Sequence, residues 1–247
     1  MIKLPDLKPR RFPWGLLVAA IFVIVLAVTY LSSQGFSMNI SRSHNVLVWL
    51  RDPSSYPSWQ VHVGQRCREA PFLMPTSGFI GFLWDDSFRI GHRHQGIDIF
   101  GGSDVNLTPV VAAFSGYLTR SPDWKSSLII RIPNDPLLPG RQIWTYYTHM
   151  ADEQGISFID DAFPPGTLDK YVEAGTLLGF QGNYSGDPGN PTGVHLHFSI
   201  VMDDGNGGYL NELEIENTLD PSPYLGIPLN ARQNQGQIPV CDETAAK

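Results

Sequence analysis

Cysteine is scarce in this sequence: only Cys67 and Cys241 occur among its 247 residues. Structural zinc sites usually close with four protein ligands that commonly include thiolates. Two cysteines so far apart argue against a site of that kind. No H-E-x-x-H segment is present either, which argues against a thermolysin-like site with a glutamate base.

Positive charge is also in short supply, with 17 Lys and Arg residues against 24 Asp and Glu residues and a formal net charge of −7. Proteins that bind nucleic acids or anionic wall polymers by electrostatics present broad basic surfaces. We therefore expect no nucleic-acid partner and no tight electrostatic binding of anionic polymers.

Helical periodicity is rare. Outside one long apolar run, no window shows an extended 3.6-residue apolar period bounded by caps. Short β-like runs instead recur between Gly, Pro, Asn and Asp clusters. They lie at 96–100, 109–119, 127–132, 143–150, 176–182 and 195–202. The sequence therefore predicts a mainly β domain.

The exception is the run at 14–31, WGLLVAAIFVIVLAVTYL, which contains no charged residue. As a helix it measures about 27 Å, close to the thickness of a bilayer core. Basic residues precede it at Lys3, Lys8, Arg10 and Arg11, and the next one is Arg42. By the positive-inside rule, we predict a single-pass anchor in the cell membrane, with a cytoplasmic N-terminus and an exported remainder.

A cleaved signal peptide is the alternative, although no convincing A-x-A site follows the run. We divide the chain accordingly into a basic cytoplasmic tail (1–13), a transmembrane anchor (14–31), a stalk (32–66), a folded domain (67–225) and a C-terminal tail (226–247). Within the stalk, the apolar patch 45–50 predicts one short strand.

Export also bears on the two cysteines, because thiols in exported proteins are usually paired. We expect a Cys67–Cys241 disulfide that ties the C-terminal tail to the start of the folded domain. Two unpaired thiols are the alternative, since the sequence does not give the geometry that a disulfide requires.

Five of the seven histidines lie in three short segments, 91–102, 143–150 and 193–200. His195 and His197 form H-x-H, and in a strand they project from one face with Cα atoms about 7 Å apart. His94 and Asp98 form H-x-x-x-D; they would lie about 13 Å apart in an extended chain, too far to bind one ion without a bend.

Gly96 could supply that bend. Two imidazoles and one carboxylate leave a fourth zinc position for water, whose pKa then falls toward 7. His44 and His62 are expected to be ordinary surface or packing residues. His92 either donates a hydrogen bond to one of the metal ligands or is simply exposed.

These segments, in their order along the chain, resemble the lysostaphin/LytM-type zinc metallopeptidases, which are peptidoglycan endopeptidases. The resemblance covers residues 78–225, from GFIGFLWDDSFRIGHRHQGIDIFGG through YYTHM to PTGVHLHFSI and LDPSPYL. It implies a compact antiparallel β-sheet domain of the duplicated-hybrid-motif type, with a groove walled by loops. The folded domain 67–225 would then be a zinc metallopeptidase domain.

The resemblance also implies a role for each motif residue. His94, Asp98 and His197 would bind Zn²⁺. His149 and His195 would be catalytic, handling the proton of the zinc water and stabilising the oxyanion.

Departures from the family pattern include Ser199 after HLHF and Pro191 before Thr192. The loops 152–170 and 182–193 also look longer than usual, which affects the expected substrate choice rather than the chemistry.

We therefore expect a membrane-anchored zinc metalloendopeptidase that hydrolyses peptidoglycan stems or cross-bridges. One alternative is a non-catalytic cell-wall scaffold or activator of wall amidases. Another is a zinc peptidase that acts on a different exported peptide, since the same site would serve.

Overall fold

The structure is a computed structural model that describes residues 14–33, 40–87 and 91–241. The chain divides into two compact units, Met1–Ser37 and Met38–Lys247. The predicted basic tail (1–13), part of the predicted stalk (34–39) and the end of the predicted C-terminal tail (242–247) lie outside the described residues.

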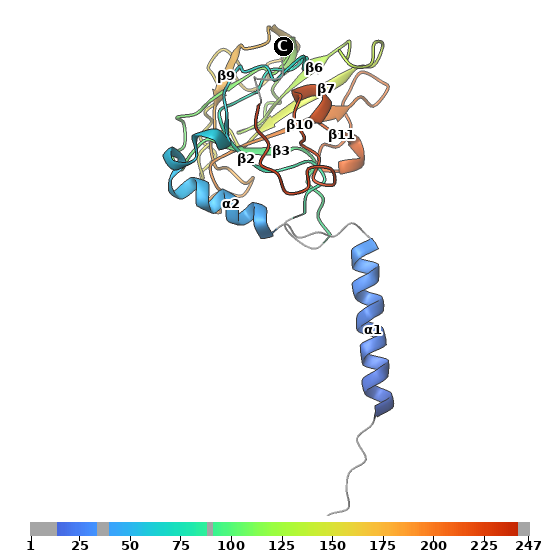
Figure 1. The fold of residues 1–247 in the computed structure, drawn as a ribbon. Helices are drawn as coiled ribbons and strands as arrows, with labels where there is room; N and C mark the ends of the chain where they lie inside the picture. Colours follow the sequence, from blue (N-terminus) through green and yellow to red (C-terminus); the bar gives the residue numbers. More distant parts are fainter. Residues whose placement is uncertain (1–13, 34–39, 88–90, 242–247) are drawn as a thin grey trace, which may run out of the picture. The chain divides into compact units, whose positions relative to one another are not determined.

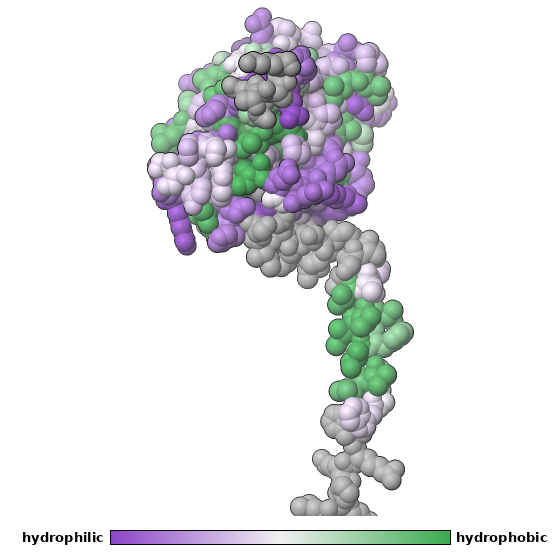
Figure 2. All heavy atoms as spheres, viewed as in Figure 1, coloured by the Kyte–Doolittle hydropathy of each residue, from purple (hydrophilic) through white to green (hydrophobic). Residues whose placement is uncertain are grey.

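The first unit contains helix α1 (Trp14–Ser33), so the apolar run is helical as predicted. Its side chains from Trp14 to Tyr30 are exposed, and Figure 2 shows most of the helix as hydrophobic. No helix among the described residues has both the length and the apolar character needed to cross a membrane. The membrane anchor is therefore not confirmed.

The second unit is built on antiparallel β-structure, which confirms the prediction of a mainly β domain (Figure 1). Its nine-stranded sheet has the order β1-β2-β3-β10-β7-β6-β5-β8, and β11 pairs with β10. The strands of this sheet are β1 (Gln60–Val61), β2 (Gly78–Phe82), β3 (Ile97–Phe100), β5 (Gly116–Thr119), β6 (Leu128–Ile132), β7 (Ile143–Thr148), β8 (Lys170–Val172), β10 (Leu196–Met202) and β11 (Thr218–Leu219). A separate pair joins β4 (Pro109–Val111) to β9 (Leu177–Phe180).

Strand β10 lies in the middle of the sheet, between β3 and β7. Leu196, Phe198 and Ile200 alternate along it and are fully buried in the main hydrophobic core. His197 lies between the first two of these residues and so projects from the opposite face. Alternation along β10 therefore directs apolar side chains into the core from one face of the strand and the His197 imidazole to the opposite face.

The prediction of a strand at 45–50 is wrong, because these residues lie in helix α2 (Ile40–Arg51). Val46 and Trp49 are buried three positions apart, as one face of a helix requires. They pack against Phe79 and Phe100 of the sheet, with Leu50 beside them. The described part of the predicted stalk, from Ile40 onward, is thus packed on the β-structure. The short 3₁₀ turns Pro53–Ser55 and Pro57–Trp59 connect α2 to β1.

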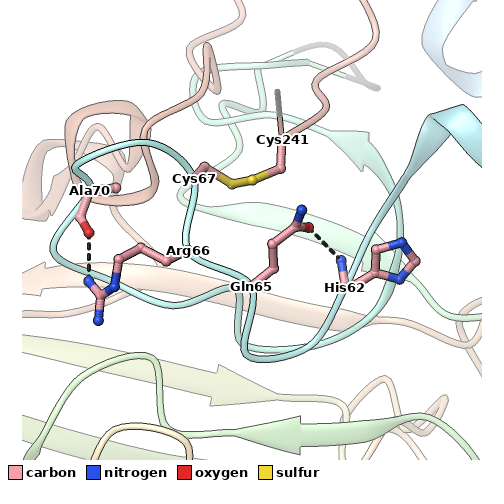
Figure 3. Close-up of a disulfide and its surroundings, with 6 residues drawn as sticks. All are labelled: His62, Gln65, Arg66, Cys67, Ala70 and Cys241. Carbon is pink, nitrogen blue, oxygen red and sulfur yellow. Dashed lines mark hydrogen bonds between the residues drawn. A yellow bond between two sulfur atoms is a disulfide. The ribbon is translucent and has the colours of Figure 1, made fainter. Parts of the chain in front are cut away.

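The predicted C-terminal tail is folded from 226 to 241. It follows the 3₁₀ turn Ile215–Asn217 and helix α3 (Ser222–Leu225), and it buries Leu229 and Asn234. The disulfide Cys67–Cys241 is present, with Cα atoms 5.2 Å apart, as predicted (Figure 3). Next to it, Arg66 Nη1 donates to the carbonyl oxygen of Ala70 at 2.6 Å.

Candidate metal centre and active site

Three side chains with metal-binding atoms meet where β3 and β10 lie side by side. Asp98 on β3 is the register partner of His197 on β10, and His94 precedes β3. His94 Nε2 lies 3.0 Å from Asp98 Oδ1 and 3.0 Å from His197 Nδ1. His197 Nδ1 lies 2.9 Å from Asp98 Oδ1. One nitrogen of each ring and one carboxylate oxygen thus converge on a single point.

This donor set fits zinc. Two imidazole nitrogens and a carboxylate oxygen are common zinc ligands, and tetrahedral bonds of zinc length place the ligand atoms roughly 3.3 Å apart. The separations of 2.9 to 3.0 Å between the three donor atoms are close to that value. Their assignment as metal ligands stays a prediction.

Close passage of the chain over β10 explains how H-x-x-x-D becomes compact. A Cβ atom on Gly96 would lie 2.2 Å from the carbonyl oxygen of Phe198. Only glycine therefore lets this segment pass β10 closely enough for His94 to fold back onto Asp98. The structure gives Gly96 a packing role: its backbone lies against β10, and its φ is outside the left-handed region that only glycine adopts readily.

Asp98 is held ionised. Burial opposes its charge, but the neighbouring His94 and His195 and the hydrogen bond from His197 hold the pKa of Asp98 well below its usual range. Burial likewise opposes the charge on His94, and the Asp98 carboxylate outweighs it and raises the pKa of His94.

His195 and His149 lie next to this cluster with their ring centroids 4.5 Å apart. His195 Nδ1 lies 2.7 Å from the carbonyl oxygen of Gly193, and His149 Nδ1 lies 2.6 Å from that of Tyr184. A ring nitrogen this close to a carbonyl oxygen carries the proton and donates it. In each neutral ring Nε2 is then the acceptor, and that of His195 lies 3.7 Å from Asp98 Oδ1.

Both of these imidazoles are biased toward the neutral form. Burial lowers the pKa of His195 to about 4 and also lowers the pKa of His149. At neutral pH both rings are therefore proton acceptors at Nε2. His149 also has a φ of +73°, a left-handed conformation that a non-glycine residue adopts at a cost.

All five predicted site residues are thus brought together in one groove, whereas His44 and His62 do not line it. His44 and His62 are exposed, as expected. His92 lies beside the site, with its ring centroid 6.4 Å from that of His94.

A groove of about 1080 Å³ contains the five site residues. Its walls include the predicted loop 182–193, through Tyr184, Ser185, Gly186, Thr192 and Gly193. The loop 152–170, which the structure describes in full, contributes no lining residue, so its expected place in the groove wall is not found.

Two parts of the groove were not predicted from the sequence. On the β2 side, α2 supplies Val46, Leu47 and Leu50. On the β7 side, the wall is polar and aromatic, and its residues include Asp123, Trp124, Lys125, Ser127, Tyr146, Thr148 and Glu212. Hydroxyl groups are linked there, since Ser127 Oγ lies 2.7 Å from Thr148 Oγ1 and Tyr146 donates to Ser127 at 3.1 Å.

No protein-family model matches the chain, and no curated protein matches it significantly. The chain is similar to a solved structure described as a glycyl-glycine endopeptidase lytM from Ruminococcus gnavus, at 24% identity and a TM-score of 0.34, over 53% of this chain and 45% of that one.

It is also similar to a peptidase M23 from Pseudomonas aeruginosa, at 18% identity and a TM-score of 0.37, over 76% and 62% of the two chains. A third is a variant catalytic domain of the prophage-encoded M23 protein EnpA from Enterococcus faecalis, at 19% identity and a TM-score of 0.35, over 60% and 95%. The chain spans less than two thirds of the length of the first two structures. All three are named as lytM or M23 proteins, the type of peptidase whose motifs this sequence resembles.

Proposed function

We propose that this protein is a zinc metalloendopeptidase that hydrolyses peptide bonds in the stems or cross-bridges of peptidoglycan. The observation that carries the proposal is the convergence of His94, Asp98 and His197 beside the imidazoles of His149 and His195 in one groove. Three protein ligands with a position left for water are the stoichiometry of catalytic rather than structural zinc.

The chain's own residues account for the proton steps of hydrolysis. Zinc, when bound by His94, Asp98 and His197, supplies a Lewis acid and lowers the pKa of water. His149 and His195 are neutral, so either can accept a proton of the attacking water at Nε2. That proton then passes to the amine nitrogen as the C–N bond breaks. The protonated ring can also donate to the oxyanion that forms from the carbonyl oxygen.

The substrate follows from the resemblance in the sequence and from the shape of the site. The groove has a volume of about 1080 Å³, at the upper limit of small-molecule pockets (about 300–1,000 Å³), so it has room for a peptide segment. To test the proposal, purified protein is incubated with Zn²⁺ and bacterial sacculi of several wall types, and new amino termini are counted. We expect release of amino termini from at least one wall type. No release from any of them would contradict the proposal.

Substitution of His195 separates an enzyme from a wall scaffold or an activator of amidases. We expect His195→Ala to keep one zinc per chain and to lose turnover by a factor of 100 or more, as loss of an acid–base group does. His62→Ala is the matched control, because His62 is exposed and does not line the groove. If His195→Ala loses no activity in the wall assay, the protein acts by binding, as a wall scaffold or an activator of amidases.

We also propose that the protein is held in the cell membrane by the run 14–31, with its N-terminus in the cytoplasm. The support is the uncharged run itself and the basic residues before it. The test compares the full chain with residues 38–247 after alkaline carbonate extraction of membranes. We expect only the full chain to stay in the pellet. Extraction of both would contradict anchoring.

A further inference from the structure

The turn Leu83–Asp86 makes three hydrogen bonds with His94, one of the proposed metal ligands. The amide of Asp85 donates to the His94 carbonyl at 2.8 Å, and the His94 amide donates to the Asp86 carbonyl at 2.8 Å. His94 Nδ1 donates to the Leu83 carbonyl at 2.9 Å. The backbone and the ring of His94 are therefore both fixed by this turn, and Nε2 is left to face Asp98.

The same turn is held from its other side by Arg42 of helix α2. Arg42 Nε lies 3.1 Å from Asp86 Oδ2, and the two side chains are only 5% and 3% exposed. Arg42 Nη2 also donates to Asn234 Oδ1, in the C-terminal segment, at 2.7 Å. The guanidinium of Arg42 thus connects three parts of the fold: helix α2, the turn Leu83–Asp86 and the C-terminal segment that contains Asn234.

The C-terminal segment reinforces this junction through the backbone. The amide of Trp84 donates to the Leu229 carbonyl at 3.0 Å, and the amide of Ala231 donates to the Trp84 carbonyl at 2.9 Å. The position of the turn therefore depends on two segments that lie outside the histidine motifs.

Burial makes the Arg42–Asp86 pair sensitive to disruption. Removal of one partner of a buried ion pair leaves the other charge without compensation, which is far more costly than the loss of an exposed pair. Without Arg42, the buried Asp86 carboxylate is stabilised most simply by moving toward water. Because the carbonyl oxygen of Asp86 accepts a hydrogen bond from the His94 amide, this movement would also shift His94.

We propose that Arg42 is a positioning residue for the metal site: its ion pair with Asp86 holds the turn Leu83–Asp86 where His94 Nε2 meets Asp98 and His197. Docking of α2 and of the C-terminal segment thereby sets metal affinity. This inference rests on the metal site of the proposed function.

The test measures Zn²⁺ affinity of the full-length chain by competition with a chromogenic chelator. Residues that orient metal ligands typically change affinity 10- to 100-fold when replaced, so we expect Arg42→Met to weaken Zn²⁺ binding at least about tenfold. Arg42→Lys, which keeps the charge, should recover part of that loss. The double variant Arg42→Met/Asp86→Asn should bind no more weakly than Arg42→Met alone, because both lose the same link.

The control is the ion pair of Arg141 with Asp135, whose carboxylate is buried like that of Asp86. It lies just before β7, whereas the site lies at the other end of that strand. We expect Arg141→Met to lower the unfolding temperature but to leave Zn²⁺ affinity within twofold. A general loss of stability would instead weaken binding in both variants.

Two outcomes would overturn the inference. One is Zn²⁺ affinity in folded Arg42→Met equal to that of the unaltered chain; if Arg42→Met does not fold, equal affinity in Arg42→Lys has the same force. The other is an equal loss of affinity in Arg141→Met. Failure of the unaltered chain to bind Zn²⁺ would instead contradict the proposed function, so the two failures are distinguishable.

Discussion

Three of the site histidines, His94, His149 and His195, are oriented in the same way. Each donates from Nδ1 to a backbone carbonyl oxygen, at distances of 2.9, 2.6 and 2.7 Å. A carbonyl oxygen accepts at any pH, so this contact fixes the protonated nitrogen without adding a titrating partner. Nε2 of each ring is thereby reserved for the metal or for proton transfer.

Asp98 contacts both imidazoles of the proposed ligand set, so its charge should matter more than its size. We expect Asp98→Asn to weaken Zn²⁺ binding by a factor of 100 or more while the fold is kept, because the amide has nearly the same shape but no negative charge. Chelator competition and circular dichroism together measure this. Affinity within threefold of the unaltered chain would contradict the ligand assignment.

The pH dependence of stability follows from the pKa of His195, which burial lowers to about 4 from 6.5. Below about pH 6.5 the unfolded chain binds a proton at His195 that the folded, metal-free chain excludes. Stability therefore falls as pH drops from 6.5 toward 4, by up to about 1.4 kcal/mol per pH unit from this group. Urea unfolding of the metal-free chain and of His195→Gln measures the difference; equal slopes in the two would contradict this account.

At the scale of elements, the sequence predicted the alternation of side chains along a strand. It did not predict structure that depends on contacts between segments far apart in the chain. Alternation in HLHFSI correctly placed His197 opposite the buried Leu196 and Phe198. Helix α2 was mistaken for a strand because NVLVWL is a short, nearly continuous apolar run, in which helical and strand periods cannot be told apart. No local signal pairs Arg42 with Asp86, since their contact exists only once α2 packs on the sheet.

Close passage between β3 and β10 gives a prediction for Gly96. A methyl group there would lie 2.2 Å from the Phe198 carbonyl oxygen, which is backbone and cannot rotate away. We expect Gly96→Ala to destabilise the protein by about 3 kcal/mol, the upper end of the range typical of overpacking. Gly193→Ala is the control, since its Cβ would meet only the Phe100 ring, at 3.5 Å. Similar unfolding midpoints for the two variants would contradict the packing argument.

Helix α2 gives a prediction for substrate binding. Leu47 lines the groove and is 58% exposed, so it contributes little to the core. We expect Leu47→Asp to raise KM several-fold with kcat and unfolding temperature nearly unchanged, because burial of a leucine by substrate is worth about 1.5 kcal/mol or more. Leu137→Asp is the control, as Leu137 is also exposed but does not line the groove. An equal change in KM in both variants would contradict the assignment of α2 to the substrate-binding surface.

At the scale of the whole molecule, the C-terminal segment of the second unit is tied to two segments that lie early in this unit. Arg42 contacts Asn234, and Cys67 is joined to Cys241. The C-terminal segment is thus a structural part of the domain, because it buries Leu229 and pairs with Trp84. The cysteine count predicted the covalent link, but it could not show that the segment supports the turn at His94.

The disulfide closes a loop with a sequence separation of 174 residues. Loop-closure entropy for that length predicts stabilisation of about 5 kcal/mol. We expect Cys67→Ser/Cys241→Ser to unfold at lower urea concentration and to lose amide protection first in the segment from Ile227 to Cys241, since that end is then held only by noncovalent contacts. A reducing agent should shift the unaltered chain in the same direction and leave the double variant unchanged. Unaltered protection in this segment would mean that packing of Leu229 and Asn234 alone keeps it in place.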